Sequence, residues 1–202
     1  MHRRIFLFAG FAILLLTGGV AQAAVSADDA QKFINGLGSD AIGALTGSGL
    51  STADREARFD VLLKANFDMP GISKFVLGRY WKIATPDQQT EFESLLEKLL
   101  TQSYAKAFAQ YSGQKFTVTG TRSNDDGSTI VNSTIVQPNG DIIRCDWRVE
   151  DVAGKTMITD LFIEGVSLRT THRSDFASAI QSNGGTVKGL LDVLRQKVNG
   201  QQ

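Results

Sequence analysis

The chain has 202 residues, of which 42% are hydrophobic, and its 21 basic residues balance 21 acidic ones. A neutral chain without a basic stripe is unsuited to a phosphate backbone, so we expect no nucleic acid partner. Two histidines and one cysteine rule out a three-histidine site and an internal disulfide, and we expect no metal and no cofactor.

The N-terminus has the pattern of an export signal. Arg3 and Arg4 precede an apolar run over 5–16, and the small-x-small sequence Ala21-Gln22-Ala23 follows. The run is shorter than the roughly 20 residues that a membrane-spanning helix needs. We therefore expect a signal peptide over 1–23, cleaved after Ala23, with Sec and Tat export both open. Residues 24–202 are expected to form a single domain.

Helical periodicity dominates the first half of the mature chain. Apolar residues at three-four spacing predict a helix over 28–45, and Ser51 with Asp54 three residues later predicts the start of a second. A short apolar turn over 72–77 ends at Gly78. The clearest start signal is Thr85-Pro86-Asp87-Gln88, which predicts a capping box and a long amphipathic helix to about Tyr111.

Beyond residue 113 the apolar period changes to two, and turn signals separate four strands. In the third strand Ile143, Cys145, Trp147 and Val149 alternate with charged residues, so one face is apolar. For the fourth strand we favour the register that turns Met157, Leu161 and Ile163 inward. Two closing helices follow, and the order predicts an α+β fold with several helices on a curled four-stranded antiparallel sheet.

Catalytic motifs are weak. Ser167 lies in a sequence that fails the G-x-S-x-G elbow at its last position. Cys145 is expected on the buried sheet face with no activating neighbour, so core packing is favoured over a thiol–imidazole pair with His172. Asp125 and Asp126 are read as turn residues instead of a calcium loop. We predict no catalytic residue and no enzymatic activity. Wide apolar faces remain, and an ordinary core or a cavity between helices and sheet explains them.

Two stretches resemble the MlaC family of periplasmic phospholipid carriers, also described as toluene-tolerance proteins. The first is FDMPGISKFVLGRYW at 67–81, followed by 84–86 and 91–92, and the second is EGVSL at 164–168 with RSDF at 173–176. The second signature usually has an aromatic residue where this chain has His172. The resemblance covers roughly residues 30–198.

The resemblance implies a monomeric carrier in the periplasm whose apolar cavity takes the acyl tails of a phospholipid. It also implies transport between an outer-membrane lipoprotein–porin complex and an inner-membrane ABC transporter with an MCE-domain subunit, and so a role in outer-membrane lipid asymmetry. A hopanoid or another lipid is an alternative cargo. Two acyl chains cost roughly 25 kcal/mol to expose to water at about 0.8 kcal/mol per methylene, so such a carrier needs an enclosed cavity.

Sheet parity and the stripe of the long helix select the candidate lipid-binding residues, each of which is also a candidate for plain core. They are Leu96, Leu99, Phe108, Val118, Ile143, Trp147, Leu161 and Ile163. Arg79 and Arg173 are candidates for contact with a headgroup or partner, or for structural ion pairs. Two other classes stay open: an exported lipid or envelope hydrolase that uses Ser167 or His172, and an interaction module with a solid core.

Overall fold

The computed structural model describes residues 24–200, so the signal peptide predicted over 1–23 lies outside the described residues. In chain order the elements are α1 (Ala27–Leu45), α2 (Thr52–Asn66), α3 (Met69–Leu77), the 3-10 helix η1 (Gly78–Lys82), α4 (Pro86–Ala109), β1 (Lys115–Ser123), β2 (Thr129–Val136), β3 (Ile142–Val152), β4 (Lys155–Ile163), β5 (Val166–Ser167), α5 (Leu168–Ser182) and α6 (Val187–Asn199). This order confirms the α+β class. The sheet has five strands instead of four, because two-residue β5 pairs with the end of β4.

Side-chain caps fix the starts of the helices, as the sequence predicts. The Ser51 hydroxyl accepts a hydrogen bond from the backbone N–H of Asp54 at 3.0 Å. Thr85 and Gln88 form the predicted capping box, with bonds of 3.2 and 3.1 Å between side chains and backbone N–H groups. Each satisfies N–H groups that the first helical turn leaves unpaired. Within residues 24–200, no helix combines the length and apolarity that crossing a membrane requires.

The sheet is antiparallel throughout, in the order β1-β2-β3-β4-β5. Trp147 on β3 lies opposite Val131 on β2 and Leu161 on β4, so these three side chains share the face that turns toward the helices. Register shifts interrupt the ladders in β1 and β4. Such bulges bend and twist a strand, which curls the sheet.

The bulge in β4 corrects one sequence prediction. Leu161 and Ile163 face inward as expected, opposite Trp147 and Cys145. Beyond the shift, Ile158 pairs with inward-facing Val149 and is fully buried, whereas Met157 pairs with Glu150 on the other face. The prediction that Met157 points inward is therefore wrong, because the extra residue reverses the parity.

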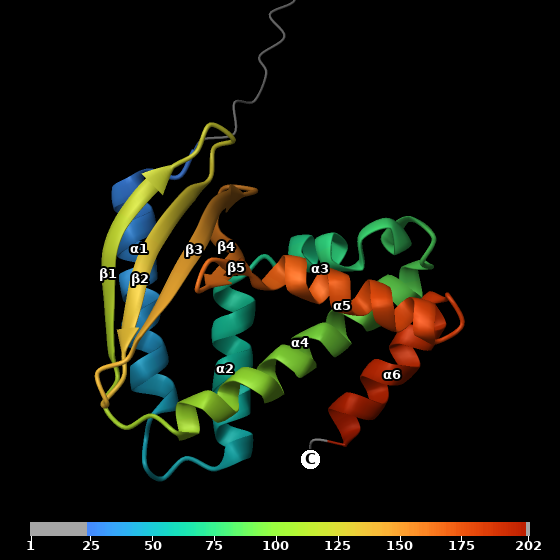
Figure 1. Cartoon of the computed structure of the whole chain (residues 1–202), viewed down its shortest axis with the longest axis horizontal. Coiled ribbons are helices and arrows are strands. Elements are labelled where there is room, and N and C mark those ends of the chain that lie inside the picture. Colours follow the sequence, from blue (N-terminus) through green and yellow to red (C-terminus); the bar gives the residue numbers. More distant parts are fainter. Residues whose placement is uncertain (1–23, 201–202) are drawn as a thin grey trace, which may run out of the picture.

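Two separate cores stabilise the molecule. Figure 1 shows the sheet and α1 at one end, α3, α5 and α6 at the other, and α2 and α4 between them. The sheet core contains Val25, Ala30, Ile34, Val131, Val149 and Ile158. The helical core is built from α2 to α6 and includes Phe92, Leu96, Phe176, Ile180, Leu190 and Leu194. Phe67 packs against both cores and bridges to Ile158 of β4, so the α2–α3 junction ties the two ends together.

Candidate ligand cavity

Two adjoining apolar pockets lie between the inward sheet face, α1 and the helices. The central pocket, about 430 Å³, is lined by side chains of α1 to α4, β2 to β4 and α5. A second pocket of about 320 Å³ lies between α1, the end of α4 and the strands, and we call it the glutamine pocket after Gln114 and Gln137 in its wall. Both pockets share Leu37, Ala41, Ala107, Phe108, Ile135, Ile143 and Trp147. These volumes fall in the range of small-molecule sites.

Close approach of α1 to the sheet shapes the glutamine pocket. A Cβ at Gly38 would lie 2.6 Å from the Phe116 ring, so the glycine lets that ring lie directly against the helix. Phe116 in turn meets Trp147 edge to face, with ring centroids 6.3 Å apart and planes at 84°. This is a preferred geometry for aromatic pairs. The two rings form a stiff wall of the cavity.

Trp147 presents its indole ring to both pockets because its polar group is satisfied elsewhere. Its Nε1–H donates to the Ser133 hydroxyl at 2.9 Å, and that hydroxyl donates to the Cys145 carbonyl at 2.7 Å. A buried indole N–H without a partner would cost about 1–3 kcal/mol. Because its N–H is paired with Ser133, the indole ring presents only apolar surface to the pockets.

The polar side chains near the start of α5 form hydrogen bonds and an ion pair with one another. Asp160 is 3% exposed; it accepts a hydrogen bond from the Ser167 hydroxyl at 2.6 Å and pairs with Arg169 at 3.1 Å. The Arg169 guanidinium also lies over the Phe75 ring, 4.4 Å from its centroid. Ser167 caps α5 by accepting from the Thr170 N–H. The central pocket consequently has a closed ion pair at this end, and no net charge comes from it.

Burial favours the neutral forms of Cys145 and His172, two titratable side chains of the central pocket. Burial, with additions from Asp146 and Glu164, raises the pKa of the Cys145 thiol to about 11, the reverse of what a nucleophilic thiolate needs. Burial is also the main cause that lowers the pKa of His172, which stacks on Phe176 with centroids 5.8 Å apart. Across residues 24–200, no group of three His, Cys, Asp or Glu side chains is placed to hold a metal ion.

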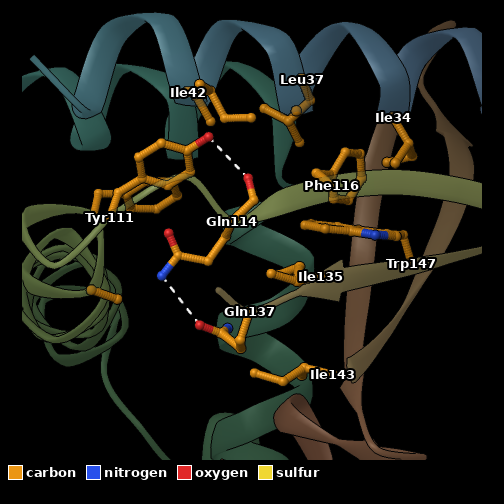
Figure 2. Close-up of a pocket in the computed structure, with 14 residues that line it drawn as sticks. Ile34, Leu37, Ile42, Tyr111, Gln114, Phe116, Ile135, Gln137, Ile143 and Trp147 are labelled. Atoms are coloured by element: carbon orange, nitrogen blue, oxygen red, sulfur yellow. Dashed lines mark hydrogen bonds between the residues drawn. The ribbon is translucent and has the colours of Figure 1, made fainter. Parts of the chain in front are cut away.

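One side of the glutamine pocket is polar but uncharged. Figure 2 shows Tyr111, Gln114 and Gln137 on one side of the pocket, across from the rings of Phe116 and Trp147. The Tyr111 hydroxyl donates to the Gln114 carbonyl at 2.9 Å, and the Gln114 amide donates to the Gln137 side-chain oxygen at 3.1 Å. The chain contributes no charged side chain to this lining.

The structure brings five of the predicted lipid-binding residues together and places three elsewhere. The central pocket is lined by Phe108, Ile143, Trp147, Leu161 and Ile163. The other three are Leu96 and Leu99, which pack in the helical core, and Val118, which packs against the sheet core. α4 contacts α6 from Glu91 to Gln102, and it lines the cavity from Leu100 onward. The apolar side chains of this one helix therefore face the helical core in its first half and the cavity in its second half.

Arg79 and Arg173 lie outside both pockets. Arg79 donates to the Tyr80 hydroxyl at 2.9 Å, and the Arg173 guanidinium lies over Phe75 at 5.0 Å, close to Gly78. Neither forms an ion pair with a carboxylate of residues 24–200, so the alternative that they form structural salt bridges is wrong.

Sequence reasoning missed the wall contributed by the first two helices and by two strands. The missed residues include Leu37, Ala41, Phe59, Leu62, Leu63, Phe116 and Ile135, along with Gln114 and Gln137. The parity that selects Val118 on β1 and Ile143 on β3 also turns Phe116 and Ile135 inward. Period-two alternation therefore carried the signal for those two residues. For α1 and α2, the apolar stripe marked a buried face without showing that it borders a void.

An uncharged, almost wholly apolar cavity between a curled sheet and a helical layer defines a binding protein for an apolar ligand. The family model described as "MlaC protein" matches residues 42–196 of the chain. The chain belongs to the MlaC family, as its two sequence signatures predict.

Two curated relatives and one solved structure show the same relationship. The toluene tolerance protein Ttg2D of Pseudomonas putida is 27% identical over 126 residues, which cover 62% of this chain and 59% of that protein. The intermembrane phospholipid transport system binding protein MlaC of Haemophilus influenzae is 31% identical over 146 residues, covering 70% and 66%. The matched regions thus span less than two thirds of either relative. A phospholipid-binding protein from Ralstonia solanacearum, solved in complex with a phospholipid, has a TM-score of 0.77 and 27% identity over 85% of this chain and 98% of that chain.

Proposed function

We propose that this protein is a periplasmic phospholipid carrier that holds acyl chains in the two adjoining pockets. The observation that carries the proposal is that two apolar pockets adjoin along seven shared lining residues, and that one of them has an uncharged polar side. Each buried methylene contributes about 0.8 kcal/mol, so an apolar void of this kind stabilises hydrocarbon strongly. The similar fold of the phospholipid-bound Ralstonia protein supports the same cargo.

The carrier moves lipid between an outer-membrane lipoprotein–porin complex and an inner-membrane ABC transporter with an MCE-domain subunit. The name of the Haemophilus relative, a binding protein of an intermembrane phospholipid transport system, supports this role. The export pattern over 1–23 supports a periplasmic site of action. Exchange between compartments of equal apolarity needs no chemical step on the carrier, and we assign it no catalytic residue.

The hydrolase alternative finds little support at Ser167. Its hydroxyl donates to the Asp160 carboxylate, which also pairs with Arg169, and bonds with Thr170 at 2.9 Å at the start of α5. His172 stacks on Phe176, and its Nε2 has no hydrogen-bond partner among residues 24–200. Ser167 and His172 therefore do not form the serine–histidine hydrogen bond that activates a serine nucleophile.

Lipid extraction tests the proposal, with adjacent residues as a matched pair. Ile143 lines both pockets, whereas Ile142 is 60% exposed. The wild-type protein and the variants Ile143→Lys and Ile142→Lys are purified from the native envelope, and bound lipid is quantified by mass spectrometry. We expect stoichiometric phospholipid in the wild type and in Ile142→Lys, and strong loss in Ile143→Lys because an ammonium group enters the cavity. Wild-type protein recovered repeatedly without lipid would refute the proposal, and recovery of a hopanoid would change its cargo.

A further inference from the structure

The amide chain along the glutamine pocket is fixed in one orientation by a backbone N–H. The Ser112 N–H donates to Gln114 Oε1 at 2.8 Å. Since a backbone N–H can only donate, this Gln114 atom must be the oxygen, and its Nε2 is the donor to Gln137 at 3.1 Å. The accepting atom of Gln137 is therefore also its oxygen. The Ser112 N–H thus determines the orientation of both side-chain amides.

The consequence is a pair of unused donors at the pocket. Gln137 Nε2 carries two hydrogens, and neither has a partner among the described residues. The backbone of Gln137 is held in place, since its N–H donates to the Asp141 carbonyl at 2.8 Å and its carbonyl accepts from the Gly140 N–H at 2.9 Å. The side chain is thus a positioned donor, held at its oxygen by Gln114 and at its backbone by the β2–β3 turn.

We propose that Gln137 binds an acceptor oxygen at the junction between the acyl chains and the headgroup of the bound lipid, with Gln114 as its positioning residue. This inference rests on the proposed function. The acceptor is an ester carbonyl or a phosphate oxygen, because both present lone pairs to a neutral amide. The headgroup end of the lipid lies at the glutamine pocket, and the acyl chains extend past Phe108 and Trp147 into the central pocket.

The other end of the cavity is unsuited to that role. There Asp160 and Arg169 already pair, and the Arg169 guanidinium is further engaged by the Thr159 carbonyl at 3.3 Å and by Phe75. A phosphate would have to break this pair and leave a buried carboxylate uncompensated, which is strongly unfavourable. The glutamine pocket instead offers donors that are already oriented and carry no charge, so recognition there is indifferent to the net charge of the headgroup.

Binding of three probes to delipidated protein tests the inference. The probes are dioleoyl phosphatidylglycerol, its dialkyl ether analogue with the same headgroup, and the purely apolar dye N-phenyl-1-naphthylamine. The variants are Gln137→Leu and the near-isosteric Gln137→Glu, which keeps an acceptor for Gln114 and removes the donors. Gln110→Leu is the matched control, because Gln110 is exposed at the end of α4 and lies outside the pocket lining. Thermal melts report folding for every variant.

We expect Gln137→Leu to weaken phosphatidylglycerol binding about five- to tenfold, as for one lost hydrogen bond, with dye binding unchanged. Gln137→Glu weakens it at least as much, and Gln110→Leu leaves it unaltered. An effect that vanishes with the ether lipid identifies an ester carbonyl as the acceptor, and one that persists identifies a phosphate oxygen. Equal phospholipid binding by wild type and Gln137→Leu, or parallel loss of dye and lipid, overturns the inference. Wild-type protein that binds the dye but no phospholipid refutes the proposed function itself.

Discussion

Filling the cavity from α1 should separate the stability of the protein from its affinity for lipid. Ala41 lies on the wall that both pockets share, and Ala41→Phe places a phenyl ring in the void. Burying that ring stabilises the empty protein by about 1–2 kcal/mol, a partial share of what a fully buried Phe contributes. For a chain of this size each kcal/mol raises Tm by about 2–4 °C. We expect the delipidated variant to melt higher than wild type.

The same ring competes with the cargo. It displaces about four methylenes of acyl chain, which at about 0.8 kcal/mol each amounts to about 3 kcal/mol, or roughly a 100-fold loss of affinity. Phospholipid titration by fluorescence and melting curves of delipidated protein measure the two effects. Ala57→Phe is the control, because Ala57 is exposed on α2 and borders neither pocket.

Opposite signs for stability and affinity are the signature of a real void. In a solid interior the added ring would be overpacked and would destabilise the protein by about 1–3 kcal/mol. A lower melting temperature for delipidated Ala41→Phe, together with unchanged lipid affinity, would therefore refute the assignment of this space as a ligand cavity.

Three further predictions concern single residues. Gly38→Ala should destabilise the protein by about 1–3 kcal/mol because the added Cβ meets the Phe116 ring. Gly36→Ala has open space around its Cβ and should stabilise α1 by about 0.5–1 kcal/mol. Urea unfolding measures both free energies, and equal effects would contradict the close approach of α1 to Phe116. The pKa of His172 is lowered from 6.5, chiefly by burial, so the unfolded chain binds its proton more readily, and stability is lost as pH falls below about 6.5. His172→Phe should flatten that part of the stability–pH profile, and an unchanged slope would show that the imidazole does not cause it. With its pKa raised from 9.0 to about 11, Cys145 should react with iodoacetamide at pH 8 about 100-fold more slowly in the folded protein than in urea, and comparable rates would show that the thiol is accessible.

Local sequence signals predicted the elements well because each acts within a few residues. The capping box at Thr85 and Gln88 and the cap at Ser51 require only neighbours along the chain. The bulge that reverses the parity of Met157 has no comparable signal. It arises from how β4 must bend against its neighbour, and nothing in its sequence marks the residue that is left unpaired.

The cavity wall was only partly predictable for a related reason. An apolar side chain that faces a void and one that faces a core produce the same periodicity, so Leu96 and Phe108 on α4 could not be told apart. Gln114 and Gln137 are 23 positions apart, and β1–β2 pairing brings them together. Beside turn residues, each appears as an ordinary polar loop residue, and only the register of the sheet reveals that they meet.

The division of the interior into a sheet core and a helical core makes tolerance to mutation uneven. Side chains of either core contact one another, so a change there weakens the fold. Cavity side chains such as Leu161 and Ile163 use part of their surface to contact the bound molecule. Substituting them therefore changes the shape of the cavity and leaves both cores intact. A fold arranged in this way can bind an apolar ligand of a different shape after substitutions at the cavity-lining residues alone.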